Sequence, residues 1–162
     1  MLNEFTRRYL LDGLRASPQV LEHLMNDADP SIWDRRPVPG RFTIREVCAH
    51  VADWDGVWQQ RLDVMLAGDT GNAAIPDHDP GQRAREHDYA SADPATSLQQ
   101  FKSQRAALVD RLQDLALDDW QRVGHHEVRG PFTVADLAVT ALGHDHYHLA
   151  QVTEWIQMQS ST

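Results

Sequence analysis

Two histidines near the end of the chain have a spacing that suits metal binding. His144 and His148 are four residues apart, so on a helix their side chains lie about 40° apart and can share one ion. The spacing alone is weak evidence, because a chain with nine histidines among 162 residues contains roughly 0.5 such pairs by chance. Their position on the predicted helix is more informative.

The helix face that carries His148 is apolar. At about 100° of rotation per residue, four apolar side chains fall within roughly 40° of His148: Leu137, Ala141, Val152 and Trp155. His146 points about 160° away and is expected in solvent. Two neighbouring imidazoles in a core each have a ring nitrogen to satisfy and cannot readily both be charged. A shared metal ion meets that need.

A metal centre with catalytic potential usually has three protein ligands and one open position. His50 is the best third ligand, because it lies about 40° from Trp54 and about 60° from Val47, on the shoulder of an apolar stripe. We therefore predict a metal site formed by His50, His144 and His148. Taken alone, His50 would more often be a partly exposed histidine bonded to a carbonyl, so the prediction depends on the three residues together.

Other reactive residues receive packing or supporting roles. Cys48 lies about 160° from His50 around the helix, which indicates a small core side chain and not a nucleophile. Asp53 and Asp55 follow His50 by three and five residues. They are candidates for orienting a ligand or accepting a proton, with ordinary surface carboxylates as the alternative. No catalytic or cofactor-binding residue is assigned, because the chain has no HExxH, GxGxxG, P-loop or GxSxG motif.

The remaining aromatic and imidazole side chains have simpler interpretations. Three tryptophans are predicted to pack in the core, with the option of lining a substrate pocket near the metal: Trp54, Trp58 and Trp155. Four histidines outside the predicted helices are expected in solvent: His78, His87, His125 and His126.

The elements that must position these residues are helices. Four segments repeat apolar residues at helical spacing: residues 2–26, 43–68, 93–115 and 133–158. A kink or restart is expected at Ser17-Pro18, and Gly68 is a natural stop. Residues with capping chemistry open three of the segments: Thr43 with Glu46, Asp93 with Pro94, and Thr133 with Asp136. The pattern predicts an all-α four-helix bundle.

The connecting segments carry no convincing strand pattern, so strands are not expected apart from a short ribbon near 122–130. Residues 33–42 and 118–132 are interpreted as connectors. Residues 68–92 are rich in glycine, proline and aspartate and are long for an ordinary loop. They are predicted to be a mobile flap or a partner-contacting segment, with disorder as the alternative.

The composition fits one cytoplasmic globular domain over residues 1–162. The chain is 41% hydrophobic, and its net charge of −9 with scattered basic residues argues against nucleic acid as a partner. One cysteine excludes an internal disulfide and fits a reducing compartment. Neither a signal peptide nor an apolar run of about 18 residues is found, so no membrane association is expected.

Two sequence stretches carry a family resemblance. RRPVPGRFTIREVCAHVADWD contains a Pro-Gly turn, an aromatic residue, a Thr-x-x-Glu cap and then His50, while GPFTVADLAVTALGHDHYHLAQV ends in an HxxxH-L-x-Q pattern. Together they resemble the DinB superfamily, which includes the YfiT-like proteins. The resemblance implies an up-down-down-up four-helix bundle in which His50, His144 and His148 bind a divalent metal: zinc or nickel, with iron or manganese as alternatives. It also implies a homodimer.

The resemblance leaves several functions in competition. Characterised members include S-transferases that couple a low-molecular-weight thiol, such as bacillithiol or mycothiol, to an electrophile, and a mycothiol-dependent isomerase. The leading hypothesis is therefore a metal-dependent thiol S-transferase whose partners are a small-molecule thiol and an electrophile. A hydrolase that activates water at the same ion is the rival enzyme, and a metal-carrying, stress-related bundle is the non-enzymatic alternative.

Overall fold

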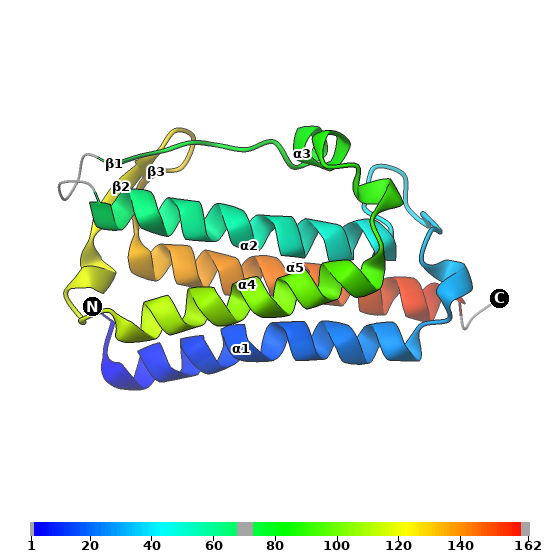
Figure 1. The fold of residues 1–162 in the computed structure, drawn as a ribbon, viewed down its shortest axis with the longest axis horizontal. Helices are drawn as coiled ribbons and strands as arrows, with labels where there is room; N and C mark the ends of the chain where they lie inside the picture. Colours follow the sequence, from blue (N-terminus) through cyan, green and yellow to red (C-terminus); the bar gives the residue numbers. More distant parts are fainter. Residues whose placement is uncertain (1, 68–72, 160–162) are drawn as a thin grey trace.

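The computed structural model describes residues 2–67 and 73–159. Four long helices form a bundle (Figure 1): α1 (Glu4–Asp27), α2 (Ile44–Ala67), α4 (Pro94–Asp114) and α5 (Val134–Gln159). In Figure 1, α1 and α5 run from left to right and α2 and α4 run from right to left. This confirms the all-α, up-down-down-up four-helix bundle. Each of α1 and α2 packs against both α4 and α5.

The predicted caps form where the sequence places them. The Thr43 amide donates to Glu46 Oε2 at 2.7 Å, and the Glu46 amide donates to Thr43 Oγ1 at 3.1 Å. Thr133 and Asp136 make the same reciprocal pair at the start of α5. These bonds satisfy amides that a helix start leaves open. They fix where α2 and α5 begin, and therefore where their histidines fall.

Helix α1 runs without interruption through Pro18, so the alternative of a restart there is wrong. A proline inside a helix cannot donate to the carbonyl four residues earlier, which here belongs to Leu14. That carbonyl accepts instead from Arg105 Nη1 of α4 at 3.1 Å. Because a neighbouring helix supplies the missing donor, α1 continues past the proline.

The long connection between α2 and α4 follows from topology, because two consecutive parallel helices require the chain to return along the bundle. This segment contains β1 (Ala73–Ile75), the short helix α3 (Pro80–Glu86) and the 3₁₀ turn η2 (Tyr89–Ser91), so the expectation that no strand forms outside residues 122–130 is wrong at β1. In Figure 1 it runs along α2, above it in the view, from β1 at the left to α3 at the right, and β1, α3 and η2 all contact α2. Residues 68–72, with the predicted stop Gly68, lie outside the described residues.

A small sheet closes one end of the bundle. The expected ribbon near 122–130 is an antiparallel hairpin of β2 (Val123–His126) and β3 (Gly130–Thr133), and β1 adds to β2 in parallel. β1 is not predicted from the sequence because three residues are too few to show alternation. Two further 3₁₀ turns, η1 (Pro30–Ile32) and η3 (Asp119–Gln121), lie in the connectors.

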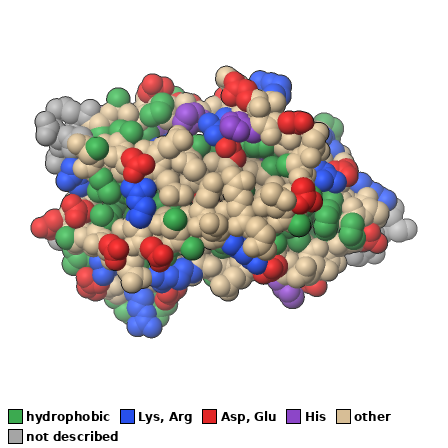
Figure 2. Space-filling model, viewed as in Figure 1, with side chains coloured by type: hydrophobic (Ala, Val, Ile, Leu, Met, Phe, Trp, Pro, Cys, Tyr) green, Lys and Arg blue, Asp and Glu red, His purple; other side chains and the backbone are tan. Residues whose placement is uncertain are grey.

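The surface is mixed in charge. On the face seen in Figure 2, acidic and basic side chains are interspersed, and histidines lie near the upper edge, where Figure 1 shows the segment that leads to α3. Among the described residues, no helix combines the length and apolar character needed to cross a membrane.

Candidate metal centre

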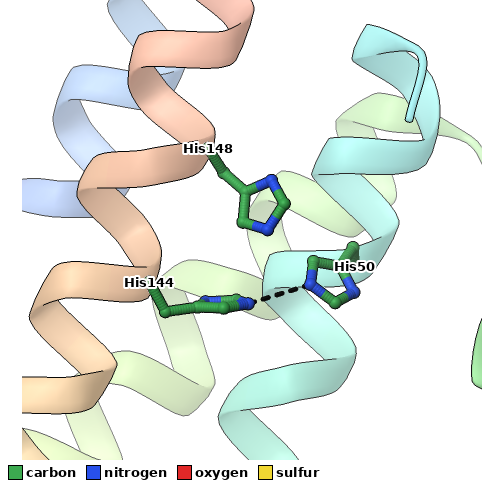
Figure 3. A group of neighbouring side chains, drawn as sticks. All are labelled: His50, His144 and His148. Carbon is green, nitrogen blue, oxygen red and sulfur yellow. Dashed lines mark hydrogen bonds between the residues drawn. The ribbon is translucent and has the colours of Figure 1, made fainter. Parts of the chain in front are cut away.

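The three predicted histidines meet between two helices. His50 comes from α2, and His144 and His148 come from successive turns of α5, with their rings turned toward one another (Figure 3). One ring nitrogen from each residue lies within 4.8 Å of the others. The Nε2 atoms of His50 and His144 are 2.8 Å apart, and the ring centroids of His50 and His148 are 4.6 Å apart. Two histidines 94 residues apart in the chain, His50 and His144, therefore meet in one compact cluster.

Burial keeps two of these imidazoles neutral. His50 is 2% exposed and His148 is 5% exposed. Burial, and then the neighbouring imidazoles, lowers the pKa of His50 to about 2. Burial and then His144 lower the pKa of His148 to about 3. A neutral imidazole keeps a lone pair on one ring nitrogen, which is the form that binds a metal.

The cluster has unmet bonding capacity. The Nδ1 atoms of His50 and His144 are buried and have no hydrogen-bond partner among the described residues. Asp145 Oδ1 lies 3.9 Å from His144 Nδ1, which is beyond hydrogen-bond distance. Buried polar atoms are normally satisfied in native structures. Independently of these Nδ1 atoms, three imidazoles whose ring nitrogens converge within 4.8 Å match the donor set of a divalent metal, so the residues fit the ion that the sequence predicts.

Gln151 fixes the tautomer of His148. Its Nε2 donates to the carbonyl oxygen of Phe42 at 2.7 Å, and because a carbonyl can only accept, the amide orientation of Gln151 is determined. Gln151 Oε1 then faces His148 Nδ1 at 3.2 Å, so that nitrogen must carry the proton. The lone pair of His148 is left on Nε2. Gln151 thus holds His148 in the tautomer whose Nε2 can bind a metal.

Gln151 was not predicted as a site residue, although the sequence contains a signal for its role. A glutamine three residues after a buried histidine lies on the same helix face. Its amide can therefore reach the ring of that histidine, and its burial at 2% exposure requires partners for both amide atoms.

The two aspartates after His50 bind arginines. Asp53 accepts two hydrogen bonds from Arg83 at 2.7 Å each, and a third from Tyr89 Oη. Asp55 pairs with Arg105 through contacts of 2.6 and 3.0 Å. Neither of the roles predicted for them, as orienter of a histidine or as proton acceptor, is supported by these contacts. Asp53 instead ties α3 to α2 beside the site.

The histidines form one wall of a pocket of about 690 Å³. Aromatic side chains form much of the rest, and Pro80 and Gly81 at the start of α3 also line it. Its charged lining residues, among those the structure describes, are Arg41 and Arg129, with no aspartate or glutamate. Trp54 and Trp58 line the pocket as the sequence allowed, whereas Trp155 packs behind it in the core.

The other predicted residues fall mostly where expected. His146, His87 and His125 are exposed, and Cys48 is fully buried, with burial raising the pKa of its thiol to about 12. His126 corrects the prediction that it is solvated. It is 2% exposed because β2 turns its side chain inward, and its Nδ1 lies within hydrogen-bond distance of two backbone amides of the hairpin turn. His78 is half-buried.

Comparison with known proteins agrees with this architecture. A family model described as the DinB superfamily matches residues 14–152. No curated protein matches the chain at a significant level. Ten solved chains match it at a significant level, among them the following three. YfiT from Bacillus subtilis, described as a probable metal-dependent hydrolase with an unusual four-helix bundle topology, has a TM-score of 0.90 and 22% identity over 99% of this chain and 91% of that one.

The other two structures are more distant. The DinB-like protein YjoA from Bacillus subtilis has a TM-score of 0.64 and 14% identity over 95% of this chain and 94% of that one. TT2238, described as a four-helix bundle protein, has a TM-score of 0.62 and 21% identity over 92% and 99%. At these identities the likeness establishes the fold, and the chemistry must be argued from the site.

Proposed function

The chain belongs to the DinB superfamily, and from this membership and its three-histidine centre we propose that it is a metal-dependent enzyme that conjugates a small thiol to an electrophile. The composition of the pocket wall carries the proposal. Among the described lining residues there are three histidines, aromatic rings, two arginines and the hydroxyls of Thr140 and Tyr147, and there is no carboxylate, cysteine, serine or lysine. Neither hydroxyl has a carboxylate base beside it in this lining, so we infer that the nucleophile comes from outside the chain, as a thiol co-substrate.

The proposed metal ligands are His50, His144 and His148. Three imidazoles suit zinc or nickel, with iron or manganese as alternatives. When bound, a divalent cation held by three neutral ligands stabilises an anion at its open position and so lowers the pKa of a thiol or of water. Gln151 keeps His148 ready for this role, as described above.

The pocket residues supply binding and shelter. The rings of Phe42, Trp54 and Trp58 present an apolar surface next to the histidines, which suits an apolar electrophile and excludes water. Cys48 takes no part, because it is buried in the core and its pKa is raised. Arg41 and Arg129 add positive charge at the pocket wall.

In the proposed reaction, the sulfur of the thiol forms a bond to the electrophilic carbon while the bond from that carbon to its leaving group breaks with its electron pair. With an epoxide, the ring oxygen takes that electron pair, stays in the product and takes up a proton from solvent. The thiol proton passes to solvent, since the described pocket lining has no carboxylate to accept it. Binding both reactants in one pocket converts an encounter of two solutes into a reaction between neighbours.

A metal-dependent hydrolase is the second candidate. The likeness to YfiT supports it, since that protein is described as a probable metal-dependent hydrolase. The contacts of the nearby carboxylates argue against it. A water nucleophile gains from a general base within reach, but Asp53 and Asp145 are already bound to arginines. We therefore rank the transferase first.

The test is a direct assay of the metal-loaded protein. The protein, loaded with zinc or with nickel, is offered bacillithiol, mycothiol or glutathione together with an aryl chloride or an epoxide. Thioether formation is followed by mass spectrometry, beside a panel of ester and amide substrates for hydrolysis. His50→Ala removes one ligand, and Cys48→Ala is the matched control from the same helix.

We expect metal-dependent conjugation by the wild type, its loss in His50→Ala and its retention in Cys48→Ala. Hydrolysis without conjugation, lost in His50→Ala, would replace the transferase with the second candidate. Rates no higher than the uncatalysed reaction in both assays would leave only the metal-carrying bundle.

A further inference from the structure

The pocket continues beyond the histidines toward one end of the bundle. On α2, Trp58 lies eight residues after His50, or about 12 Å along the helix. On α5, which runs in the opposite direction, Thr140 precedes His144 by one turn. Both residues line the pocket, together with Arg129 of the β2–β3 turn, from which β3 leads into α5. We call the part bounded by Trp58, Thr140 and Arg129 the distal end.

The distal end offers hydrogen-bond donors that lack acceptors. Trp58 Nε1 is buried and has no partner among the described residues. The guanidinium of Arg129 makes no hydrogen bond or ion pair with a described side chain, and the residue is exposed. The hydroxyl of Thr140 can donate as well. A wall made of donors is complementary to a group made of acceptors.

A second guanidinium, that of Arg61, packs against the Trp58 ring. Arg61 is 3% exposed, its guanidinium carbon lies 5.1 Å from the centre of the Trp58 ring, and its Nε has no partner among the described residues. Burial and then the charge of Arg129 lower the pKa of Arg61 to about 10, so it stays charged near neutral pH.

Two carboxylates lie in the same region but not in the pocket wall. Asp77 Oδ1 is 3.6 Å from His126 Nε2, and Glu127 Oε2 accepts from the amide of Asp77. Neither residue lines the pocket. A ligand group at the distal end therefore meets positive charge and hydrogen-bond donors first.

At the other end of the pocket, the arginine has a partner within the protein. Arg41 also lines it, but its Nη1 is 2.7 Å from Glu154 Oε2, and its guanidinium carbon lies 4.5 Å from the centre of the Trp155 ring. The charge of Arg41 is compensated within the protein. Arg129 is the pocket arginine that lacks such a partner among the described residues.

We infer that the distal end binds a carboxylate carried by one of the two substrates, with Arg129 as its main contact. The inference rests on the proposed function, because that assigns the pocket to a thiol and an electrophile. A guanidinium can hold a carboxylate through two parallel charge-assisted hydrogen bonds. The Trp58 ring lies 5.8 Å from the His144 ring, so the inferred carboxylate site adjoins the place where the thiol and the electrophile would react.

Binding measurements test the inference without requiring turnover. Calorimetric titrations of the zinc-loaded protein use ω-mercaptooctanoate and its methyl ester in one arm. The second arm uses chlorodinitrobenzoate and chlorodinitrobenzene, which carry the carboxylate on the electrophile. Each compound is titrated into wild type, Arg129→Gln, Arg129→Glu and Arg8→Gln. Arg8, an exposed residue of α1, controls for the change in net charge.

Arg129→Gln is expected to weaken binding of the carboxylate compound about 10-fold in at least one arm of the experiment, because a charge-assisted hydrogen bond contributes to affinity on that scale. Arg129→Glu weakens it further, and the compounds without a carboxylate change less than about 2-fold. The arm that responds identifies which substrate carries the group. Equal effects on the charged and uncharged compounds in both arms, or effects as small as those of Arg8→Gln, would overturn the inference.

The outcome separates this inference from the proposed function. Carboxylate binding that depends on Arg129, in a protein that forms no thioether, would keep the distal end as an anion site and reject the transferase. Thioether formation that is indifferent to Arg129 with every compound would keep the transferase and reject the anion site.

Discussion

Two buried polar clusters lie side by side in this bundle, and they are built in opposite ways. The first, which we call the Arg105 cluster, joins Arg105 of α4 to Asp55 of α2 and Asp145 of α5. The second is the three-histidine cluster. Asp145 and His144 are consecutive residues, so one turn of α5 contributes to both.

The Arg105 cluster is complete. Arg105 is 1% exposed and donates to both carboxylates and to the carbonyl of Leu14. Opposite charges meet there, and each of its three guanidinium nitrogens has an acceptor. The three-histidine cluster brings like groups together and leaves two ring nitrogens without described partners. The Arg105 cluster holds helices together, whereas the convergence of three ring nitrogens within 4.8 Å marks the place of a ligand.

The largest expected effect comes from breaking the complete cluster. Arg105→Met leaves the carboxylates of Asp55 and Asp145 buried without their partner. It also removes the hydrogen-bond donor of the Leu14 carbonyl, to which Pro18 cannot donate. It should reduce the free energy of unfolding by about 3–5 kcal/mol, measured by urea denaturation. Arg111→Met on the same helix removes a partly exposed pair with Asp63 and should cost less than about 1 kcal/mol. Equal costs for the two variants would contradict the structural role of Arg105.

The incomplete cluster should gain its stability from an ion. Zinc at 100 to 1,000 times its dissociation constant should raise the free energy of unfolding by about 2.7–4.1 kcal/mol. His50→Leu should lose this gain, and its metal-free stability should stay within about 1 kcal/mol of the wild type, because it replaces a poorly satisfied group by an apolar one. If zinc and nickel left the free energy of unfolding of the wild type unchanged, the three-histidine cluster would not be a metal site.

The next largest effect is expected in acid, where the histidines should make the free energy of unfolding depend on pH. The pKa values of His50 and His148 are about 2 and about 3 in the folded chain, against 6.5 for an ordinary histidine. Below about pH 6.5 the unfolded chain takes up protons at these residues and the folded chain does not. Their stabilising contribution is therefore present above pH 6.5 and is lost as the pH falls, by up to about 1.4 kcal/mol per pH unit for each histidine.

The measurement is the free energy of unfolding of the metal-free protein between pH 7 and pH 5. The double variant His50→Leu/His148→Leu should lose less stability over this range than the wild type does. Parallel curves for the two proteins would mean that these histidines are not held neutral in the folded state.

The smallest effect concerns the glutamine that supports His148. Gln151→Leu removes the acceptor for His148 Nδ1 and should weaken metal binding about 10- to 100-fold while leaving the three ligands in place. Thr153→Val, on the same helix, removes only a hydroxyl bonded to the carbonyl of Leu149 and serves as the control. Competition for zinc with a chelating dye measures the zinc affinity of both variants. Equal affinities would show that Gln151 does not support the metal site.

Local patterns predict much of this molecule from sequence. The caps at Thr43 and Thr133 set the phase of α2 and α5, and because that phase is a local property, the inward faces of His50 and His148 could be derived before the structure. The order of the helices and the metal site followed partly from family resemblance.

Long-range contacts could not be derived in this way. The partners of Asp53 and Asp55 are Arg83 and Arg105, which lie 30 and 50 residues away. Helical periodicity does not encode such pairings. The inward turn of His126 likewise depends on strand pairing with β1 and β3, and the continuity of α1 through Pro18 depends on a donor from α4.

Metal content tests the central claim most directly. The protein and its variants are saturated with zinc, freed of excess by gel filtration, and analysed by plasma mass spectrometry. The account predicts about one ion per chain in the wild type and in His146→Ala, whose side chain points to solvent, and none in His148→Ala. Equal metal retention by His146→Ala and His148→Ala would contradict it.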